Sequence, residues 1–258
     1  MHPFDLTDQV AVVTGAGSST GIGYATAGML ARMGAAVVIT ATTDRVDERV
    51  HELRANGHDA VGVVADLTDP EQADGVIAAA TSRWGHVDIL INNAGMTSVA
   101  DPSSEHDLLT AVTLDRWQAG LRRNLDTAFL TTRAALPAMD GRAGRIVMIS
   151  SVTGPVMAMR ADPIYAAAKA GMVGLARAIA VDVAAQGITC NVVAPGWIAT
   201  GSQTPDEHEQ GLRTPLRRSA TPAEVAAAAA FLATPGAAYI TGQVIVVDGG
   251  NSIAEERA

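Results

Sequence analysis

The sequence predicts an α/β protein built on one doubly wound, parallel, seven-stranded sheet, on the strength of three observations. Short apolar runs alternate with longer helical patterns along all 258 residues, and strict alternation implies right-handed crossovers between parallel strands. The chain is rich in alanine, valine and glycine and only 3% aromatic, which suits helices packed closely on both faces of a buried sheet. No linker, repeat or second core pattern interrupts the alternation, so we expect a single domain over residues 1–258.

The expected strands are short apolar runs bounded by turn residues. They cover residues 10–14, 36–40, 60–65, 87–91, 145–149, 189–193 and 244–247. Helices are expected between them, and several carry end signals. These are a helix over residues 44–56 followed by Gly57, one from Asp69-Pro70 to about Arg83, one over residues 113–139, one from Asp162-Pro163 to Gly187, and one that opens with the capping box Thr221–Glu224 and ends near Ala233.

The glycine-rich stretch between the first strand and the first helix indicates a phosphate site. It runs Gly15-Ala-Gly-Ser-Ser-Thr-Gly21-Ile-Gly23, and in this setting backbone N–H groups and a helix N-terminus hold a pyrophosphate. The stretch does not match G-x-G-x-x-G, and a plain Gly/Ser turn is the alternative. Other polar or glycine-containing stretches also follow strands, at the edge where such sheets bind ligands. They are Thr42-Thr43, Asp66, Asn92-Asn93-Ala94-Gly95, Ser150-Ser151 and Pro195-Gly196.

Tyr165 and Lys169 lie one turn apart on the same face of an expected helix. Lys169 is the only lysine in the chain, and a compact ammonium can sit beside a phenol and stabilise its phenolate, which the wide guanidinium of arginine does poorly. Ser150 and Ser151 directly follow a predicted strand, and one of them can converge on the same spot. The alternative is an ordinary helix-surface pair, because this spacing also occurs by chance.

The composition argues against several partner classes. The net charge of −9 argues against nucleic acids and acidic membranes. The six histidines are scattered without metal-ligand spacing, and the single Cys190 is expected in the core, so we expect no metal site and no internal disulfide. The N-terminus lacks the features of a signal peptide, and no apolar run approaches the length of a membrane span, so we expect a cytoplasmic protein.

Taken together, these residues resemble the short-chain dehydrogenase/reductase family over essentially the whole chain. The matching motifs, in order, are Thr14-Gly15…Gly21-Ile22-Gly23, Asp66, Asn92-Asn93-Ala94-Gly95, Asn124, Ser151, Tyr165-x-x-x-Lys169, Pro195-Gly196 and Asp248-Gly249-Gly250. The resemblance implies a Rossmann-type fold, a nicotinamide cofactor, and hydride transfer between that cofactor and a carbonyl or alcohol.

The resemblance implies a catalytic role for four residues. Tyr165 would be the general acid/base, and Ser151 would hold the substrate oxygen. Lys169 would lower the tyrosine pKa and hydrogen-bond the nicotinamide ribose, while Asn124 would anchor a water that relays protons to Lys169.

The cofactor contacts are carried over in the same way. The expected contacts are Gly15, Ser18, Ser19, Thr20, Gly21, Ile22, Thr42, Thr43, Arg45, Asp66, Leu67, Asn93, Ala94, Gly95, Tyr165, Lys169, Pro195, Gly196, Ile198 and Thr200. Asp66 would meet the adenine ring, and Ile198 and Thr200 the nicotinamide carboxamide. For Asn93 a purely structural role is the alternative.

The chain departs from the family pattern in three places. Five residues separate Gly15 from Gly21, where family members usually have three. Ser151 lies fourteen positions before Tyr165, one more than is common, which keeps Ser150 as a substitute. Residues 96–112 form a longer segment than usual and residues 201–214 a shorter one, so the substrate does not follow from the resemblance.

Cofactor choice depends on the residues after the second strand. The position where NAD-preferring relatives carry an acidic residue falls on Ala41, while Thr42, Thr43 and Arg45 offer donors to a 2′-phosphate. We therefore expect NADP(H) to be favoured over NAD(H). Asp44 remains an alternative ribose acceptor.

These features predict an NADP(H)-dependent reductase or dehydrogenase acting on a small carbonyl or alcohol. The general architecture looks most like the 3-oxoacyl-[acyl-carrier-protein] reductases. The alternatives are an NAD-dependent alcohol, sugar or steroid dehydrogenase and, in another class, a non-catalytic dinucleotide-binding protein. The small residues of the Tyr165 helix and of the long helix before it let helices approach closely, and the family resemblance implies that these helices pair between subunits. We therefore expect a homotetramer of D₂ symmetry, with a dimer as the alternative.

Overall fold

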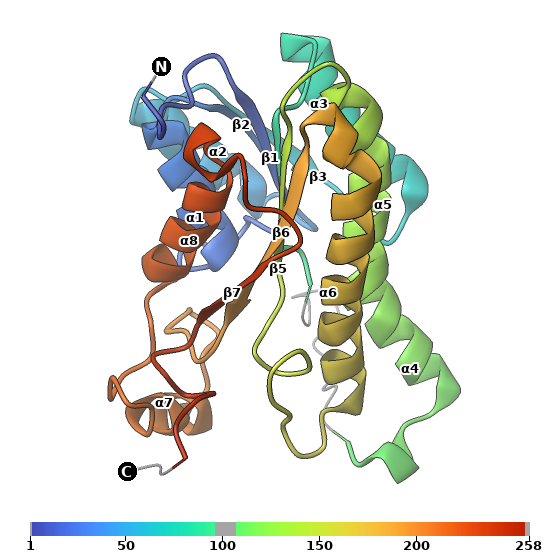
Figure 1. Cartoon of the computed structure of the whole chain (residues 1–258), viewed down its shortest axis with the longest axis vertical. Helices are drawn as coiled ribbons and strands as arrows, with labels where there is room; N and C mark the ends of the chain where they lie inside the picture. Colours follow the sequence, from blue (N-terminus) through green and yellow to red (C-terminus); the bar gives the residue numbers. More distant parts are fainter. Residues whose placement is uncertain (1, 96–106, 256–258) are drawn as a thin grey trace.

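The computed structural model describes residues 2–95 and 107–255, and its centre is a wholly parallel sheet in the order β3-β2-β1-β4-β5-β6-β7 (Figure 1). The strands are β1 (Val10–Val13), β2 (Ala36–Ala41), β3 (Ala60–Val64), β4 (Ile89–Asn92), β5 (Arg145–Ile149), β6 (Thr189–Pro195) and β7 (Val244–Val247). Each overlaps an expected strand. The order reverses between β1 and β4, which creates the crevice where ligands of doubly wound sheets bind.

Helices cover both faces of the sheet. One face carries α1 (Ile22–Arg32), α2 (Arg45–Ala55) and α8 (Pro222–Leu232), and the other carries α3 (Pro70–Trp84), α4 (Leu114–Leu121), α5 (Thr127–Ala135) and α6 (Pro163–Val183) (Figure 1). Successive side chains of a strand point to opposite faces of the sheet, which produces two cores. In β1, Ala11 and Val13 pack with the first set of helices, and Val10 and Val12 pack with the second.

The predicted helix ends are partly confirmed. Asp69 accepts a hydrogen bond from the Glu71 N–H at 2.9 Å, and Thr221 with Glu224 forms the expected capping box. Hydrogen bonds from Arg218 and from the Thr221 N–H lower the pKa of Glu224 to about 2. Asp162 does precede the first helical residue of α6, but its side chain makes no cap bond, because its backbone ψ of 46° lies outside the extended region that aims a capping oxygen at the helix.

The helix expected over residues 113–139 is not continuous. A π-helical turn, Arg122–Asp126, separates α4 from α5, and a 3₁₀ turn, Leu136–Met139, follows. Within the π turn the amide of Asn124 donates to the Gly120 carbonyl at 3.2 Å. A side chain bonded into the helix backbone in this way competes with the regular ladder and accompanies such bulges.

Helix α7 (Pro205–Leu212) was not predicted. It begins with a capping box in which Thr204 Oγ1 accepts from the Glu207 N–H at 3.2 Å and Glu207 Oε2 accepts from the Thr204 N–H at 2.7 Å. The stretch Thr204-Pro-Asp-Glu207 carries the same signal as Thr221-Pro-Ala-Glu224, so the information was present in the sequence.

The expectation that no apolar run approaches the length of a membrane span needs a correction. The helical stretch Pro163–Gln186 has a mean hydropathy of 1.4 over its most apolar window and is long and apolar enough to cross a membrane. Its composition serves packing in this fold, because Met172 and Ala176, on its own inner face, are fully buried and Lys169 is 3% exposed. Cys190 lies in the core as expected, and burial raises the pKa of its thiol to about 12.

Candidate active site

The glycine loop is tied to the sheet through Gly15. The Gly15 N–H donates to Thr40 Oγ1 at 3.2 Å, and its carbonyl accepts from Asn93 Nδ2 at 2.9 Å. A Cβ at Gly23 would lie 2.5 Å from the Gly15 carbonyl oxygen and 2.6 Å from Asn93 Nδ2, so only glycine lets α1 approach this closely. Helix α1 begins after Gly21 with no side-chain cap and no acidic residue in its first turn. Its first N–H groups and positive dipole end can therefore receive an anion.

Asn93 joins the glycine loop to β4. Its Nδ2 also donates to the Thr14 carbonyl at 3.0 Å, while Thr14 Oγ1 accepts from the N–H groups of Asn93 and Ala94, both at 2.9 Å. These bonds occupy the side-chain amide, which supports the structural alternative for Asn93. Ala94 is held directly beside Gly15, where an added Cβ would lie 2.8 Å from the Ala94 Cα.

The end of β2 places a guanidinium beside the glycine loop. Arg45 Nε donates to Thr43 Oγ1 at 3.0 Å. A Cβ at Gly17 would lie 2.6 Å from the Ala41 Cβ and 3.6 Å from Arg45 Nη2. Ala41, Arg45 and the loop thus border one space, and Thr42 is exposed next to it. Asp44, the alternative ribose acceptor, precedes α2 without capping it.

The end of β3 presents Asp66 and Leu67 differently. Asp66 is exposed, and its Oδ1 accepts from the Thr68 N–H at 2.9 Å and from Thr68 Oγ1 at 2.8 Å, which fixes the carboxylate. The Leu67 side chain is buried in the core. A cofactor contact from Leu67 would therefore have to use its backbone.

Three of the expected site residues meet around Gly95. A Cβ at Gly95 would lie 3.1 Å from Asn124 Oδ1 and 3.3 Å from Lys169 Nζ. Lys169 Nζ donates to the Ile149 carbonyl at 3.1 Å, and it lies 5.5 Å from the centroid of the Tyr165 ring. Lys169 and Asn124 are buried, while Tyr165 is half-buried. The structure thus brings Asn124, from the π turn, beside the Tyr165 and Lys169 pair of α6.

The two serines after β5 have different surroundings. Ser150 Oγ donates to the Lys169 carbonyl at 2.8 Å, so its proton is used to fasten β5 to α6. Ser151 Oγ accepts from the Thr153 N–H at 3.1 Å and so keeps its own proton available for donation. This difference favours Ser151 over Ser150 as the residue that holds a substrate oxygen.

The segment after β6 closes the other side of the crevice. The Val152 N–H donates to the Pro195 carbonyl at 2.9 Å, and the Gly196 N–H donates to the Val247 carbonyl at 3.0 Å. Ile198 pairs with Ala220, and Thr200 Oγ1 lies 3.0 Å from Ser202 Oγ. All the expected contact stretches therefore lie at the carboxyl edge of the sheet, as predicted.

Comparison with known proteins identifies the family. A family model described as enoyl-(acyl carrier protein) reductase matches residues 15–252. A 3-oxoacyl-[acyl-carrier-protein] reductase from Synechocystis is 42% identical over 250 residues, covering 95% of this chain and 97% of that protein. A short-chain type dehydrogenase/reductase from Mycobacterium marinum superposes with a TM-score of 0.88 at 32% identity, covering 98% of each chain.

This chain belongs to the short-chain dehydrogenase/reductase family. Another relative, the 3-oxoacyl-[acyl-carrier-protein] reductase FabG of Escherichia coli, is 40% identical over 94% of this chain and 96% of its own. A dehydrogenase/reductase from Sinorhizobium meliloti has a TM-score of 0.88 at 30% identity, covering 96% of this chain and 97% of its own. The protein is an NAD(P)-dependent oxidoreductase that transfers a hydride between a nicotinamide cofactor and a carbonyl or secondary alcohol.

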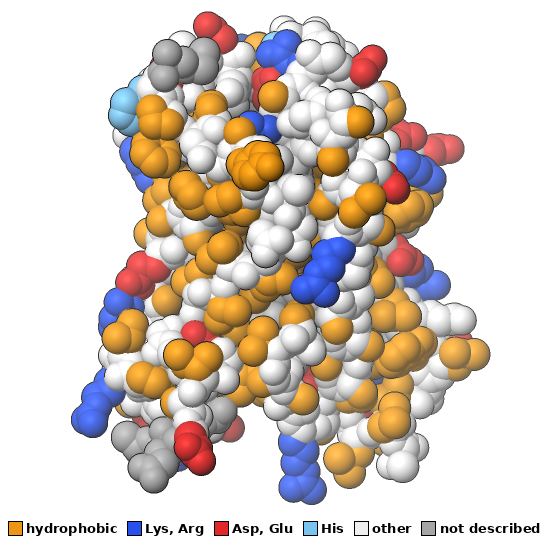
Figure 2. Space-filling model, viewed as in Figure 1, with side chains coloured by type: hydrophobic (Ala, Val, Ile, Leu, Met, Phe, Trp, Pro, Cys, Tyr) orange, Lys and Arg blue, Asp and Glu red, His pale blue; other side chains and the backbone are white. Residues whose placement is uncertain are grey.

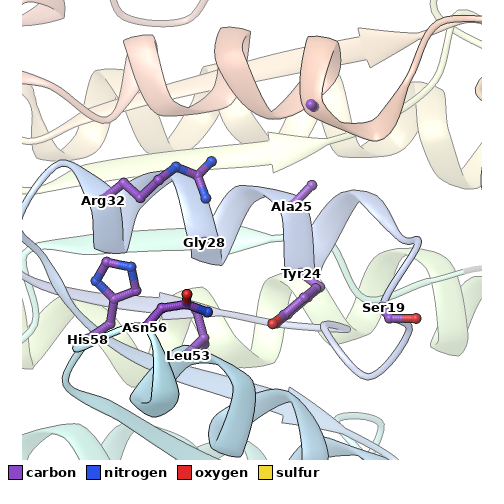
Figure 3. Close-up of a pocket in the computed structure, with 9 residues that line it drawn as sticks. Ser19, Tyr24, Ala25, Gly28, Arg32, Leu53, Asn56 and His58 are labelled. Carbon is purple, nitrogen blue, oxygen red and sulfur yellow. The ribbon is translucent and has the colours of Figure 1, made fainter.

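A groove of about 580 Å³ lies between α1 and α2, and none of Tyr165, Lys169 and Asn124 lines it (Figure 3). Of the expected cofactor contacts, it shares Ser19, and its far end holds Arg32, Asn56 and His58. Among the described residues, no cluster of three or more His, Cys, Asp or Glu side chains could hold a metal ion.

Two supports of this site were missed in the sequence. Thr131 Oγ1 donates to Asn92 Oδ1 at 2.5 Å, and Asn92 Nδ2 donates to Thr132 Oγ1 at 2.8 Å, which fastens α5 to β4 beside the π turn. The Thr131-Thr132 pair was a visible signal, because two threonines in a helix otherwise rich in alanine and leucine call for polar partners when buried.

Proposed function

We propose that this protein is an NADPH-dependent ketone reductase, with 3-oxoacyl thioesters as the first substrate class to test. The observation that carries the proposal is the convergence of Tyr165, Lys169 and Asn124 around Gly95 at the carboxyl edge of the sheet. The 42% identity to the Synechocystis 3-oxoacyl-[acyl-carrier-protein] reductase, over nearly the whole of both chains, supports the substrate class.

In this proposal the chain's own residues handle the substrate oxygen and its proton. Ser151 donates a hydrogen bond to the ketone oxygen and positions it against the Tyr165 hydroxyl. Tyr165 gives its proton to that oxygen, and the ammonium of Lys169, 5.5 Å from the ring centroid, stabilises the phenolate that results. Asn124, beside the same ammonium, positions the water through which the proton is replaced. The bound nicotinamide supplies the hydride to the ketone carbon, and the product is a secondary alcohol.

The residues that would hold the dinucleotide fit its chemistry. The uncapped start of α1 would receive the pyrophosphate, and the fixed carboxylate of Asp66 would accept a hydrogen bond from the adenine amino group. The space for a 2′-phosphate is bordered by Gly17, Ala41 and Arg45. Ala41 carries no charge that would repel the phosphate, and the guanidinium of Arg45 can pair with it.

We expect kcat/KM to be higher with NADPH than with NADH on one accepted ketone, and Arg45→Ala to reduce this ratio. Removing a charge-assisted contact at the 2′-phosphate should change the ratio by about tenfold. Asp44→Ala tests the alternative ribose acceptor next to Arg45 and should keep the preference for NADPH, because a carboxylate offers no donor to a 2′-phosphate. A preference for NADH in the unaltered protein would contradict the cofactor assignment, and an unchanged ratio in Arg45→Ala would contradict the role of Arg45 alone.

The substrate proposal is tested by NADPH and NADH oxidation with a panel of ketones that includes a 3-oxoacyl thioester, a cyclic ketone, a keto sugar and a steroid ketone. Turnover of the thioester with the highest kcat/KM would support the proposal. A higher value for a keto sugar or steroid would favour the alternative dehydrogenases. An absence of turnover, with dinucleotide binding retained, would favour a non-catalytic binding protein.

We further propose a cytoplasmic homotetramer with two-fold axes and no nucleic-acid or membrane partner, in keeping with the net charge of −9. On the outer side of α5 and α6, Phe129 is 45% and Val181 is 78% exposed, and among the described residues none outside the helix backbone and its chain neighbours lies within 4 Å of a Cβ added at Gly174. A second apolar surface lies over α8, β7 and α6, where hydrophobic side chains gather (Figure 2), Phe231 and Val246 among them.

Light scattering at micromolar concentration should give the mass of a tetramer, because two separate apolar surfaces are exposed and each can pair across a two-fold axis. Val181→Glu should reduce the mass to that of a dimer, since a charge would be buried at the α5–α6 pairing. Asp182→Glu, next to it, is the matched control. A monomer in the unaltered protein would contradict the assembly.

A further inference from the structure

The glycine loop touches the segment that follows β6, although the two are 181 positions apart in the sequence. The Gly201 N–H donates to Thr20 Oγ1 at 3.0 Å. Thr20 is the last of the five residues between Gly15 and Gly21. The Thr20 side chain therefore reaches from the glycine loop across the crevice.

The segment after β6 is anchored on its other side. The Ala199 N–H donates to the Ala220 carbonyl at 2.8 Å, and the Ala220 N–H donates to the Trp197 carbonyl at 2.9 Å. Gln203 Nε2 donates to Ser219 Oγ at 2.7 Å. These bonds fix the segment to the chain that leads into α8, so the bond to Thr20 attaches it at a second, separate place.

The contact spans the proposed dinucleotide site. Strands β1 and β6 are not neighbours, because β4 and β5 lie between them in the sheet. Thr20 immediately precedes the start of α1, where the pyrophosphate is proposed to lie, and Gly201 follows Thr200, which is expected to contact the nicotinamide carboxamide. A bond between them passes over the middle of a dinucleotide bound along this edge.

We propose that Thr20 is a positioning residue that latches the segment after β6 over the bound dinucleotide and slows its exchange. The inference rests on the proposed dinucleotide site. It also changes the expected role of Thr20, because its hydroxyl oxygen accepts a bond from Gly201 and the residue acts through that segment instead of through the cofactor.

The steric contact at Gly201 provides a second way to open the latch. A Cβ at Gly201 would lie 2.4 Å from Thr20 Oγ1 and 3.7 Å from Thr20 Cβ, and among the other described residues only its chain neighbours come within 4 Å. Gly201→Ala should therefore push the segment away from Thr20. Removing the hydroxyl with Thr20→Ala should relieve that clash, since the remaining distance is an ordinary contact.

The test is the dissociation rate of NADPH, followed by its fluorescence after addition of excess NADP⁺. Thr20→Ala and Gly201→Ala should each raise the rate by roughly two- to tenfold, as expected for loss of one hydrogen bond. Thr20→Ser keeps the hydroxyl and should stay near the unaltered protein. The double variant Thr20→Ala/Gly201→Ala should be no faster than the faster single variant.

A second measurement tests the contact between Thr20 and Gly201 in the absence of cofactor. Hydrogen exchange of peptides that cover residues 197–204 should be faster in Thr20→Ala than in the unaltered protein and nearly unchanged in Thr20→Ser. An unchanged dissociation rate in Thr20→Ala, or additive effects in the double variant, would overturn the latch while leaving the proposed function intact. If neither NADPH nor NADH binds the unaltered protein, the proposed function fails as well.

Discussion

Tyr165→Phe is expected to lower kcat for ketone reduction by about 10²–10⁴-fold, the usual contribution of a general acid. The variant removes the hydroxyl that donates the proton and keeps the ring that lies 5.5 Å from Lys169 Nζ. The packing of α6 and the position of Lys169 should therefore stay the same. The measurement is the steady-state rate at saturating NADPH and ketone.

The Kd of the dinucleotide separates a chemical role of Tyr165 from a structural one. The Kd should change by less than about threefold in Tyr165→Phe, because most of the proposed dinucleotide contacts come from residues outside α6. Tyr239→Phe is the matched control, since that tyrosine is fully exposed. If Tyr165→Phe kept near-normal turnover, the proton-donor role would be wrong.

Lys169→Arg is expected to lower kcat/KM by on the order of 10²-fold although it preserves the charge. Lys169 is 3% exposed, and its Nζ fits between the Ile149 carbonyl, at 3.1 Å, and the backbone of Gly95. A planar guanidinium is wider than this space and would displace the charge from the Tyr165 ring. The kinetics should show both a lower kcat and a weaker affinity for the dinucleotide.

Arg177→Lys is the matched control for this exchange, because Arg177 lies on the same helix and is exposed. It should leave kcat/KM within about twofold, as is usual for surface substitutions. Equal activity of Lys169→Arg and the unaltered protein would show that position 169 needs only a positive charge.

The fold was predictable from the sequence because its signals are local. Each strand is a short apolar run with a turn residue beside it, and the alternation with helices leaves few possible topologies. The capping pattern of Thr221–Glu224 correctly placed the start of α8. The same pattern at Thr204–Glu207 starts α7, which shows that this missed helix was also within reach of the sequence.

Features that depend on tertiary contacts were not predictable in the same way. The break in the long helix at Asn124 comes from a side chain bonded into the helix backbone, and no Gly or Pro marks that position. The choice between Ser150 and Ser151 required the position of the Lys169 carbonyl, to which Ser150 donates. The bond between Thr20 and Gly201 joins residues too far apart in the sequence for any local pattern to indicate.

The most direct test of the account is the transfer of deuterium from NADPH to the substrate. NADPH labelled with deuterium at C4 of the nicotinamide, on one face and then on the other, is incubated with the best ketone of the panel, and the alcohol is analysed by mass spectrometry. The account predicts that deuterium appears at the former carbonyl carbon from one of the two labelled cofactors, and that Tyr165→Phe forms this product at least about 10²-fold more slowly. An alcohol without deuterium from either cofactor, or the same rate in Tyr165→Phe, would contradict it.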